Sequence, residues 1–286
     1  MAERRFACTQ CGQCCNRAPV LELGEAAALA DVFVLQLLLR LYSLPRSLGD
    51  YVSELPRDQA SAEFYQTKRL LSAFAAASWN AKVQRGGQVV DYVQYLSLSV
   101  LPLDLGTGAC TALNGTRCSI YARRPLSCRS VPLHYSRADA FAARDLDAFV
   151  VTPGYVCATG SDAPLVIADG QIADPAMRAA RAAAVARAVA DQPWTKAIVK
   201  AMKAESHPGL PSLREVEANA PYGALTTAMT LGWQIAADAG VMTPADYRAA
   251  LAAQVAAIAR ASALPSLSAD TRQSLAQLHQ RSAAAD

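Results

Sequence analysis

The chain has 286 residues, of which 52% are hydrophobic and 18% are charged. This is the composition of a folded and rather apolar protein, and it excludes an intrinsically disordered chain. A formal net charge of +3 is too small to indicate nucleic acid or an anionic membrane as a partner.

The N-terminus reaches Cys8 without the apolar stretch that a secretory signal needs. The longest apolar run, residues 26–39, is interrupted by Asp31 and Gln36 and is shorter than the roughly 18–20 residues that span a bilayer. We therefore expect no membrane segment and a cytoplasmic location. Cytosolic thiols stay reduced, so the eight cysteines indicate metal or redox chemistry rather than disulfides.

The first half of the chain is predicted to begin with a cysteine-rich loop over residues 1–20. The apolar spacing predicts a helix over Leu21–Tyr42 and a second helix from about Arg57 to Trp79, ended by two glycines. Val89–Leu101 is rich in Val, Tyr and Leu and predicts a strand. Residues 110–157 are predicted to be loop-rich, with short elements.

The second half predicts a turn region at Pro164–Gly170, followed by alanine-rich helices. The expected helices are Pro175–Ala190, Trp194–Glu205, Leu213–Ala218, Tyr222–Ala239, Pro244–Ala261 and Asp270–Ala283. The expected fold class is therefore mainly α, with a small irregular α+β cysteine-rich metal-binding core. Two domains are predicted, a cysteine-cluster domain over residues 1–160 and an Ala-rich helical domain over residues 171–286.

The first cysteine motif is C-x-x-C-G-x-C-C, formed by Cys8, Cys11, Cys14 and Cys15. A C-x-x-C step directs two thiolates at one metal, and Gly12 permits a tight backbone there. The first three cysteines also have the C-x2-C-x2-C spacing of four-iron clusters, without the ferredoxin continuation. Because adjacent side chains in extended chain point to opposite sides, Cys14 and Cys15 are expected to serve different ions or different faces of one cluster.

The second motif spans Cys110 to Cys118 and contains Asn114-Gly115, which is typical of a hairpin. A two-residue turn would place the two cysteines on opposite faces. A three-residue loop at residues 113–115 would place them opposite each other on one face. A shared metal needs the second arrangement, so we expect the three-residue loop.

The third motif continues from Cys118 to Cys128, and Pro125 is expected to open a short helix that carries Cys128 to the site. Eight thiolates around two divalent ions would leave about four negative charges, and burying them unpaired is costly. Arg124 and Arg129 lie within a few residues of a cysteine and are predicted to pair with this charge at the cofactor.

The combined pattern of C-x-x-C-G-x-C-C, C-x7-C-S-I-Y-x-x-R-P-x-x-C-R and a late cysteine resembles the YkgJ-like CxxCxxCC family over about residues 6–158. That family is described as a zinc- or iron-chelating cysteine-cluster domain. The resemblance implies a metal site whose ligands are Cys8, Cys11, Cys14, Cys15, Cys110, Cys118, Cys128 and Cys157. Cys157 is followed by alanine where the family pattern would have proline.

The resemblance implies metal binding and leaves the reaction open. One hypothesis is a closed zinc site that organises a binding module, with a protein partner at the helical half. A second is an iron–sulfur oxidoreductase, for which a 4Fe-4S cluster is one candidate cofactor. A third is cluster-dependent protein modification, as in the flagellin lysine N-methylase group, although the chain has no glycine-rich S-adenosylmethionine fingerprint. The spacing of residues selects no catalytic residue, and therefore does not decide whether the protein is an enzyme.

Overall fold

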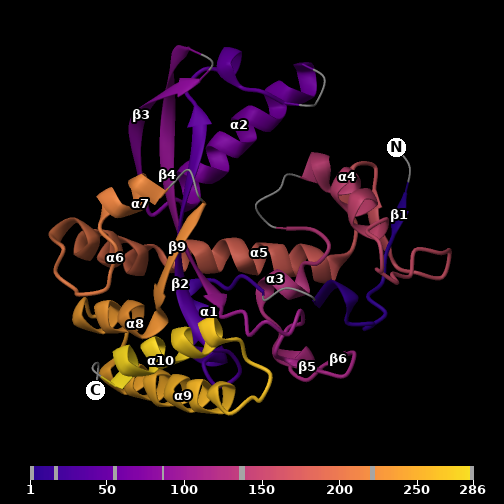
Figure 1. The fold of residues 1–286 in the computed structure, drawn as a ribbon. Coiled ribbons are helices and arrows are strands. Elements are labelled where there is room, and N and C mark those ends of the chain that lie inside the picture. The colour runs from indigo at the N-terminus through magenta and orange to yellow at the C-terminus, as the bar shows by residue number, and fades with distance from the viewer. Residues whose placement is uncertain are drawn as a thin grey trace. The chain divides into compact units, whose positions relative to one another are not determined.

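The computed structural model describes residues 3–15, 19–53, 57–85, 87–134, 139–219 and 223–283. Its secondary structure is 48% helix and 20% strand, with three antiparallel sheets. The expected mainly α class is therefore wrong, and the protein has a mixed α/β fold (Figure 1). The chain divides into two compact units, each assembled from separate stretches of sequence.

The first unit comprises Met1–Leu35, Val100–Ala190 and Arg248–Asp286. Its sheet has the order β1-β7-β8, from Arg4–Arg5, Leu165–Ala168 and Gln171–Ile172. A buried core under this sheet includes Phe6, Leu146, Val166, Ile167 and Ile172 among its members. Cys157 packs against this core, which therefore lies directly beside the cysteine-rich chain.

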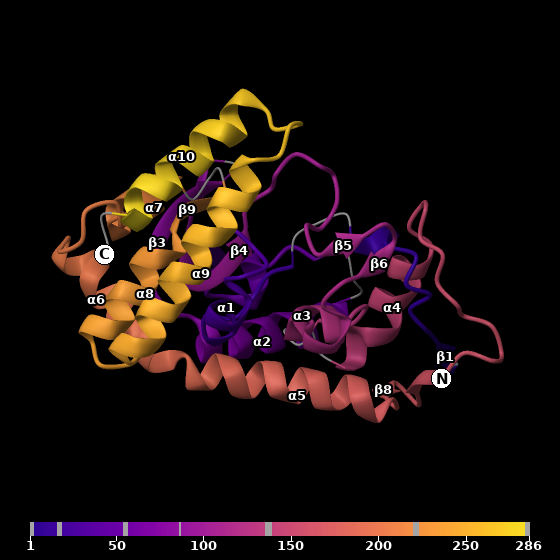
Figure 2. The ribbon, with the colours of Figure 1, turned by 90° about the horizontal axis from the view of Figure 1, so that it is seen from below.

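The remaining elements of the first unit are short near the cysteines and long toward the C-terminus. They are η1 (Gln13–Cys15), α1 (Leu23–Ala26), η2 (Ala27–Leu29), β5 (Leu113–Asn114), β6 (Arg117–Cys118), η4 (Tyr121–Arg123), α3 (Leu126–Arg129), α4 (Asp139–Val150), α5 (Pro175–Ala190), most of α9 (Pro244–Ser262) and α10 (Ala269–Ala283). Helix α5 runs alongside α3, and α9 lies beside α10 (Figure 2).

Hydrogen bonds hold in place the segments of the first unit that adjoin the cysteine motifs in the sequence. Gln254 on α9 is 1% exposed; its side chain accepts from the backbone N–H of Leu35 at 3.1 Å and donates to the carbonyl of Phe33 at 3.2 Å. Leu21 and Val100 exchange backbone hydrogen bonds of 2.8 and 2.9 Å. The segment between the first motif and α1 is therefore tied to the chain that leads to Cys110.

The second unit comprises Gln36–Ser99 and Asp191–Tyr247. Its sheet has the order β3-β4-β2-β9, from Ala77–Arg85, Gln88–Pro102, Leu35–Pro45 and Ala224–Ala228. The other elements are η3 (Leu48–Asp50), α2 (Arg57–Phe74), α6 (Gln192–Ala204), α7 (Leu213–Asn219) and α8 (Met229–Asp238). Phe64 of α2 packs with Leu44 and Tyr95 of the sheet.

Several expected helices are strands in the structure. The helix expected over Leu21–Tyr42 is confined to α1 and η2, and its second half belongs to β2. Trp79, expected at the end of a helix, lies in β3. The helix expected over Tyr222–Ala239 begins at Met229 instead, after β9; Tyr222 lies outside the described residues.

Other expected elements are confirmed. The strand expected over Val89–Leu101 is β4, and the helices expected over Pro175–Ala190 and Pro244–Ala261 are α5 and α9. The turn region expected over Pro164–Gly170 contains β7, which pairs with β1. Among the described residues, no helix is both long and apolar enough to cross a membrane.

Candidate metal centre

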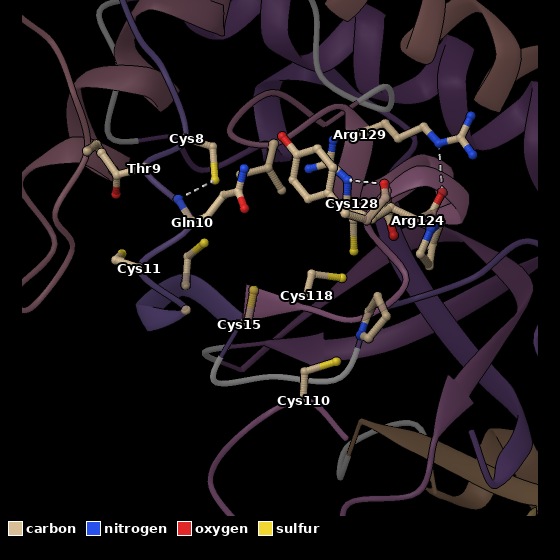
Figure 3. A pocket seen from close by; sticks show the side chains of 18 of the residues that line it. Cys8, Thr9, Gln10, Cys11, Cys15, Cys110, Cys118, Arg124, Cys128 and Arg129 are labelled. Atoms are coloured by element: carbon tan, nitrogen blue, oxygen red, sulfur yellow. Dashed lines mark hydrogen bonds between the residues drawn. The ribbon is translucent and has the colours of Figure 1, made fainter. Parts of the chain in front are cut away.

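All eight cysteines line one pocket of the first unit, which has a volume of about 470 Å³. Every thiol is free, so none of the cysteines is in a disulfide. Phe33, Ile120 and Met177 contribute apolar wall, and Arg124, Arg129, His134 and Asp174 contribute polar groups. Figure 3 shows Cys8 and Cys11 on one side of this pocket and Cys15, Cys110, Cys118 and Cys128 toward the other.

The first cysteine motif is held in position by a segment about 150 residues later in the sequence, around Ala158. Ala7 and Ala158 form an antiparallel bridge, with backbone hydrogen bonds of 2.8 and 3.2 Å. In this antiparallel register Cys8 lies opposite Cys157, because Cys8 follows Ala7 and Cys157 precedes Ala158. Arg4 also makes a two-point ion pair with Asp147 of α4, at 2.6 and 2.8 Å. These contacts fix the entry of the chain into the pocket.

The turn between Cys8 and Cys15 depends on unusual backbone conformations. Gln10 has φ 57° and Gly12 has φ 75°, both in the left-handed region. A Cβ at Gly12 would also lie 2.9 Å from the carbonyl oxygen of Thr116, in the hairpin that carries Cys118. Glycine is therefore required at position 12 for its backbone angle and for the close approach of the two cysteine segments.

The hairpin of the second motif differs from the expected one. Leu113 pairs with Cys118 and Asn114 with Arg117, so the loop has two residues, Gly115 and Thr116. The expectation of a three-residue loop with Cys110 opposite Cys118 is wrong. Cys110 instead reaches the pocket from the turn before the hairpin, where its carbonyl accepts from Leu113 N–H at 3.0 Å. The Asn-Gly dipeptide correctly predicted a hairpin turn, but it did not determine which residues of the two strands pair.

Helix α3 carries Cys128 as expected, because Pro125 precedes it and Cys128 N–H donates to the Pro125 carbonyl at 2.9 Å. A residue that the sequence did not single out holds this helix. Glu25 accepts from the backbone N–H of Leu126 at 2.8 Å and from that of Glu22 at 3.2 Å. One carboxylate thus satisfies amide groups at the starts of α1 and α3. The E-x-x-E spacing could have predicted the cap on α1 but not the contact with α3.

The two arginines predicted beside the cysteines have different surroundings. Arg124 stacks over the Tyr121 ring, with 3.6 Å between its guanidinium carbon and the ring centroid. Arg129 donates to the carbonyls of Arg124, at 2.7 Å, and Ala122, at 3.4 Å, and its guanidinium points away from the cysteines (Figure 3). Arg124 is the better placed of the two to balance thiolate charge, because its charge acts on Cys128.

Burial and hydrogen bonds act differently on the thiols. Burial is the main cause that raises the pKa of Cys110, of Cys157, and of Cys128 to about 11. The pKa of Cys11 is lowered, because the backbone N–H groups of Gln13 and Val156 donate to its sulfur. A hydrogen bond from the Cys15 thiol lowers the pKa of Cys14 to about 6. The pocket therefore combines half-buried thiols whose pKa is raised with thiols whose pKa is lowered by hydrogen bonds.

The thiols surround the pocket and do not converge on one point. Across the described ranges, no group of three or more Cys, His, Asp or Glu side chains has the spacing that would hold a single metal ion. A tetrahedral zinc site needs four sulfurs about 2.3 Å from one ion.

The comparison with family models locates the resemblance. Residues 53–157 match the CxxCxxCC family, whose description is "Putative zinc- or iron-chelating domain". The resemblance stated from the sequence is confirmed over this stretch, which contains Cys110, Cys118, Cys128 and Cys157 and is less than half of the chain. No curated protein matches the chain. No solved structure matches it either.

Gly12→Ala tests whether the two cysteine segments depend on their close approach. We expect the thermal midpoint to fall clearly further than in Gly240→Ala, because Gly240 has a similar φ of 70° but a Cβ there meets nothing within 4 Å. Strain at a positive φ costs about 1–2 kcal/mol in both variants, and Gly12→Ala adds the collision with Thr116. Equal losses by thermal unfolding would show that the close approach is not required.

Proposed function

We propose that the pocket is a metal centre in which the cysteines hold iron as iron–sulfur clusters. The observation that carries this proposal is that every cysteine of the chain lines one pocket of one unit. Thiolates are the ligands of zinc, copper(I) and iron–sulfur clusters in proteins. The family match supports metal chelation in general, by zinc or by iron.

The dimensions of the pocket favour clusters over isolated ions. Its volume of about 470 Å³ is many times the roughly 30 Å³ that one water molecule occupies in the liquid. The sulfurs of the described chain stand around this volume without forming a site for a single ion. A cluster, which contains several metal atoms and bridging sulfide, bonds to thiolates at its corners and suits such a separation.

The surroundings of the sulfurs also favour a redox centre. Backbone N–H groups donate to Cys11, and the N–H of Gln10 donates to Cys8 Sγ at 3.4 Å. Hydrogen bonds to ligand sulfur, together with an apolar shell and solvent exposure, set the reduction potential of a cluster. Cys8 is exposed, so electrons could be exchanged with a partner at this side. We therefore propose electron transfer as the role of the centre.

Metal and acid-labile sulfide content test this proposal on protein purified without oxygen. We expect iron and sulfide in near-equal amounts and a brown protein, because thiolate-bound clusters contain both elements. Zinc without sulfide, in a colourless protein, would overturn the iron–sulfur proposal and make the site a zinc centre that organises a binding module. Protein free of any metal after anaerobic reconstitution with iron and sulfide would overturn the metal centre itself.

Arg124→Gln tests the electrostatic role of the arginine beside Cys128. We expect a more negative reduction potential than in the wild-type protein, because removing a positive charge disfavours the reduced and more negative cluster. Arg129→Gln is the matched control and is expected to shift the potential less, since the Arg129 guanidinium points away from the cysteines (Figure 3). Redox titration followed by absorbance measures both shifts. An equal or larger shift in Arg129→Gln would contradict the assignment.

A further inference from the structure

The cysteines of the pocket fall into two groups of four, and these groups do not follow the order of the motifs. The sequence motifs separate Cys8, Cys11, Cys14 and Cys15 from the four later cysteines. The contacts in the structure exchange two members of these groups. Cys157 joins the first motif, and Cys15 joins the later cysteines, as the following contacts show.

Cys157 is held beside the first three cysteines by paired backbone. The Ala7–Ala158 bridge places Cys8 opposite Cys157 on two antiparallel segments. Directly opposite residues of such a pair direct their side chains to the same face. The contact continues at the neighbouring residues, Thr9 after Cys8 and Val156 before Cys157, since Thr9 Oγ1 donates to the Val156 carbonyl at 2.5 Å.

Cys11 and Cys14 complete this first group. The backbone N–H of Val156, the residue before Cys157, donates to the sulfur of Cys11. Cys14 follows Cys11 at a C-x-x-C step, a spacing that directs two thiolates at one metal. These relations place Cys11 and Cys14 beside the pair formed by Cys8 and Cys157.

Cys15 is held beside the later cysteines. Its carbonyl accepts from the backbone N–H of Cys110 at 2.7 Å. Cys118 follows in the adjoining hairpin, where Ser119 N–H donates to the Ala112 carbonyl at 2.8 Å. Figure 3 shows these three thiols and that of Cys128 around the same part of the pocket.

The two groups meet at Cys14 and Cys15, whose thiols are hydrogen-bonded to each other. Both residues lie in η1, a 3₁₀ helix over Gln13–Cys15. Successive side chains of a 3₁₀ helix are about 120° apart, because the helix has about three residues per turn. The 3₁₀ helix, rather than the extended chain expected from the sequence, can therefore present these two adjacent cysteines to two neighbouring sites.

We propose that the pocket holds two adjacent four-thiolate metal sites, one formed by Cys8, Cys11, Cys14 and Cys157 and the other by Cys15, Cys110, Cys118 and Cys128. This assignment rests on the proposed metal-binding function and adds the number of sites and the ligands of each. Each site joins the first motif to chain at least 95 residues later in the sequence, from Cys15 to Cys110. Metal binding at both sites would therefore fasten the N-terminal motif to two different segments.

Paired cysteine substitutions distinguish this assignment from a division by motif. In the C8S/C157S variant both substitutions fall in one proposed site, so we expect half of the wild-type metal content. In the C8S/C15S variant each site loses a ligand, so we expect much less than half. A division by motif gives the opposite order, because it places Cys8 with Cys15 and Cys157 with the later cysteines. Metal analysis on anaerobically reconstituted, monodisperse protein measures the ratio to wild type.

The outcomes distinguish failure of the two-site assignment from failure of the proposed metal-binding function. The opposite order, or near-complete loss in both variants, would overturn the two-site assignment while leaving a metal centre in place. Wild-type protein that takes up no metal would instead overturn the proposed function.

Alkylation of the wild-type chain gives a second measurement that needs no substitution. Iron and sulfide sufficient for one cluster are added anaerobically to metal-free protein, unprotected thiols are alkylated, and the modified cysteines are identified by mass spectrometry. We expect the cluster to protect the cysteines of one proposed set together, either the set with Cys157 or the set with Cys15. Joint protection of Cys14 and Cys15 with Cys8 and Cys11 would overturn the assignment even if the substituted variants fail to fold.

Discussion

The pairing of Ala7 with Ala158 is the contact on which the proposed centre depends. Two backbone hydrogen bonds hold the start of the chain beside a segment some 150 residues later. Closing a loop of this length has an entropic cost that grows with about 3/2 RT ln n. The apolar core beneath the bridge and the Arg4–Asp147 ion pair oppose that cost before any metal is bound. Metal–thiolate bonds would then form between segments that the fold already brings together.

The second constraint is the charge of the thiolates. Burial raises the pKa of Cys110, Cys128 and Cys157, so these groups favour the protonated form in the absence of a cation. Bound metal replaces these protons and compensates the negative charge within the apolar pocket. Backbone N–H groups at Cys11 and the guanidinium of Arg124 add partial compensation. The site therefore distributes its electrostatic support over backbone, side chain and metal.

The sequence located the cysteines of the pocket better than it predicted the path of the chain. The eight cysteines, the glycine at position 12 and the short helix after Pro125 all carry local signals, and the structure places them at one pocket. The sequence predicted a helix over Leu21–Tyr42 because apolar residues recur there at three- and four-residue steps, but its second half lies in β2, Leu35–Pro45. It is an interior strand with neighbours on both sides, and only pairing with β4 and β9 decides its conformation.

Most of the features that the sequence did not predict depend on contacts between residues far apart in the sequence. The carboxylate of Glu25 reaches Leu126, and Gln254 reaches the chain before β2, but neither contact has a signal in the local sequence. The exchange of Cys15 and Cys157 between the two groups has the same origin. It follows from the Ala7–Ala158 bridge and from the Cys15–Cys110 hydrogen bond, and both join segments whose pairing the motifs do not encode.

X-ray absorption spectroscopy at the metal edge tests the central claim most directly, because it reports the atoms bound to the metal in the intact protein. The account predicts a first shell of sulfur alone at the iron edge, together with a nearby iron scatterer that marks a cluster. A first shell containing nitrogen or oxygen would contradict it, since His134 or Asp174 of the pocket wall would then take the place of a thiolate.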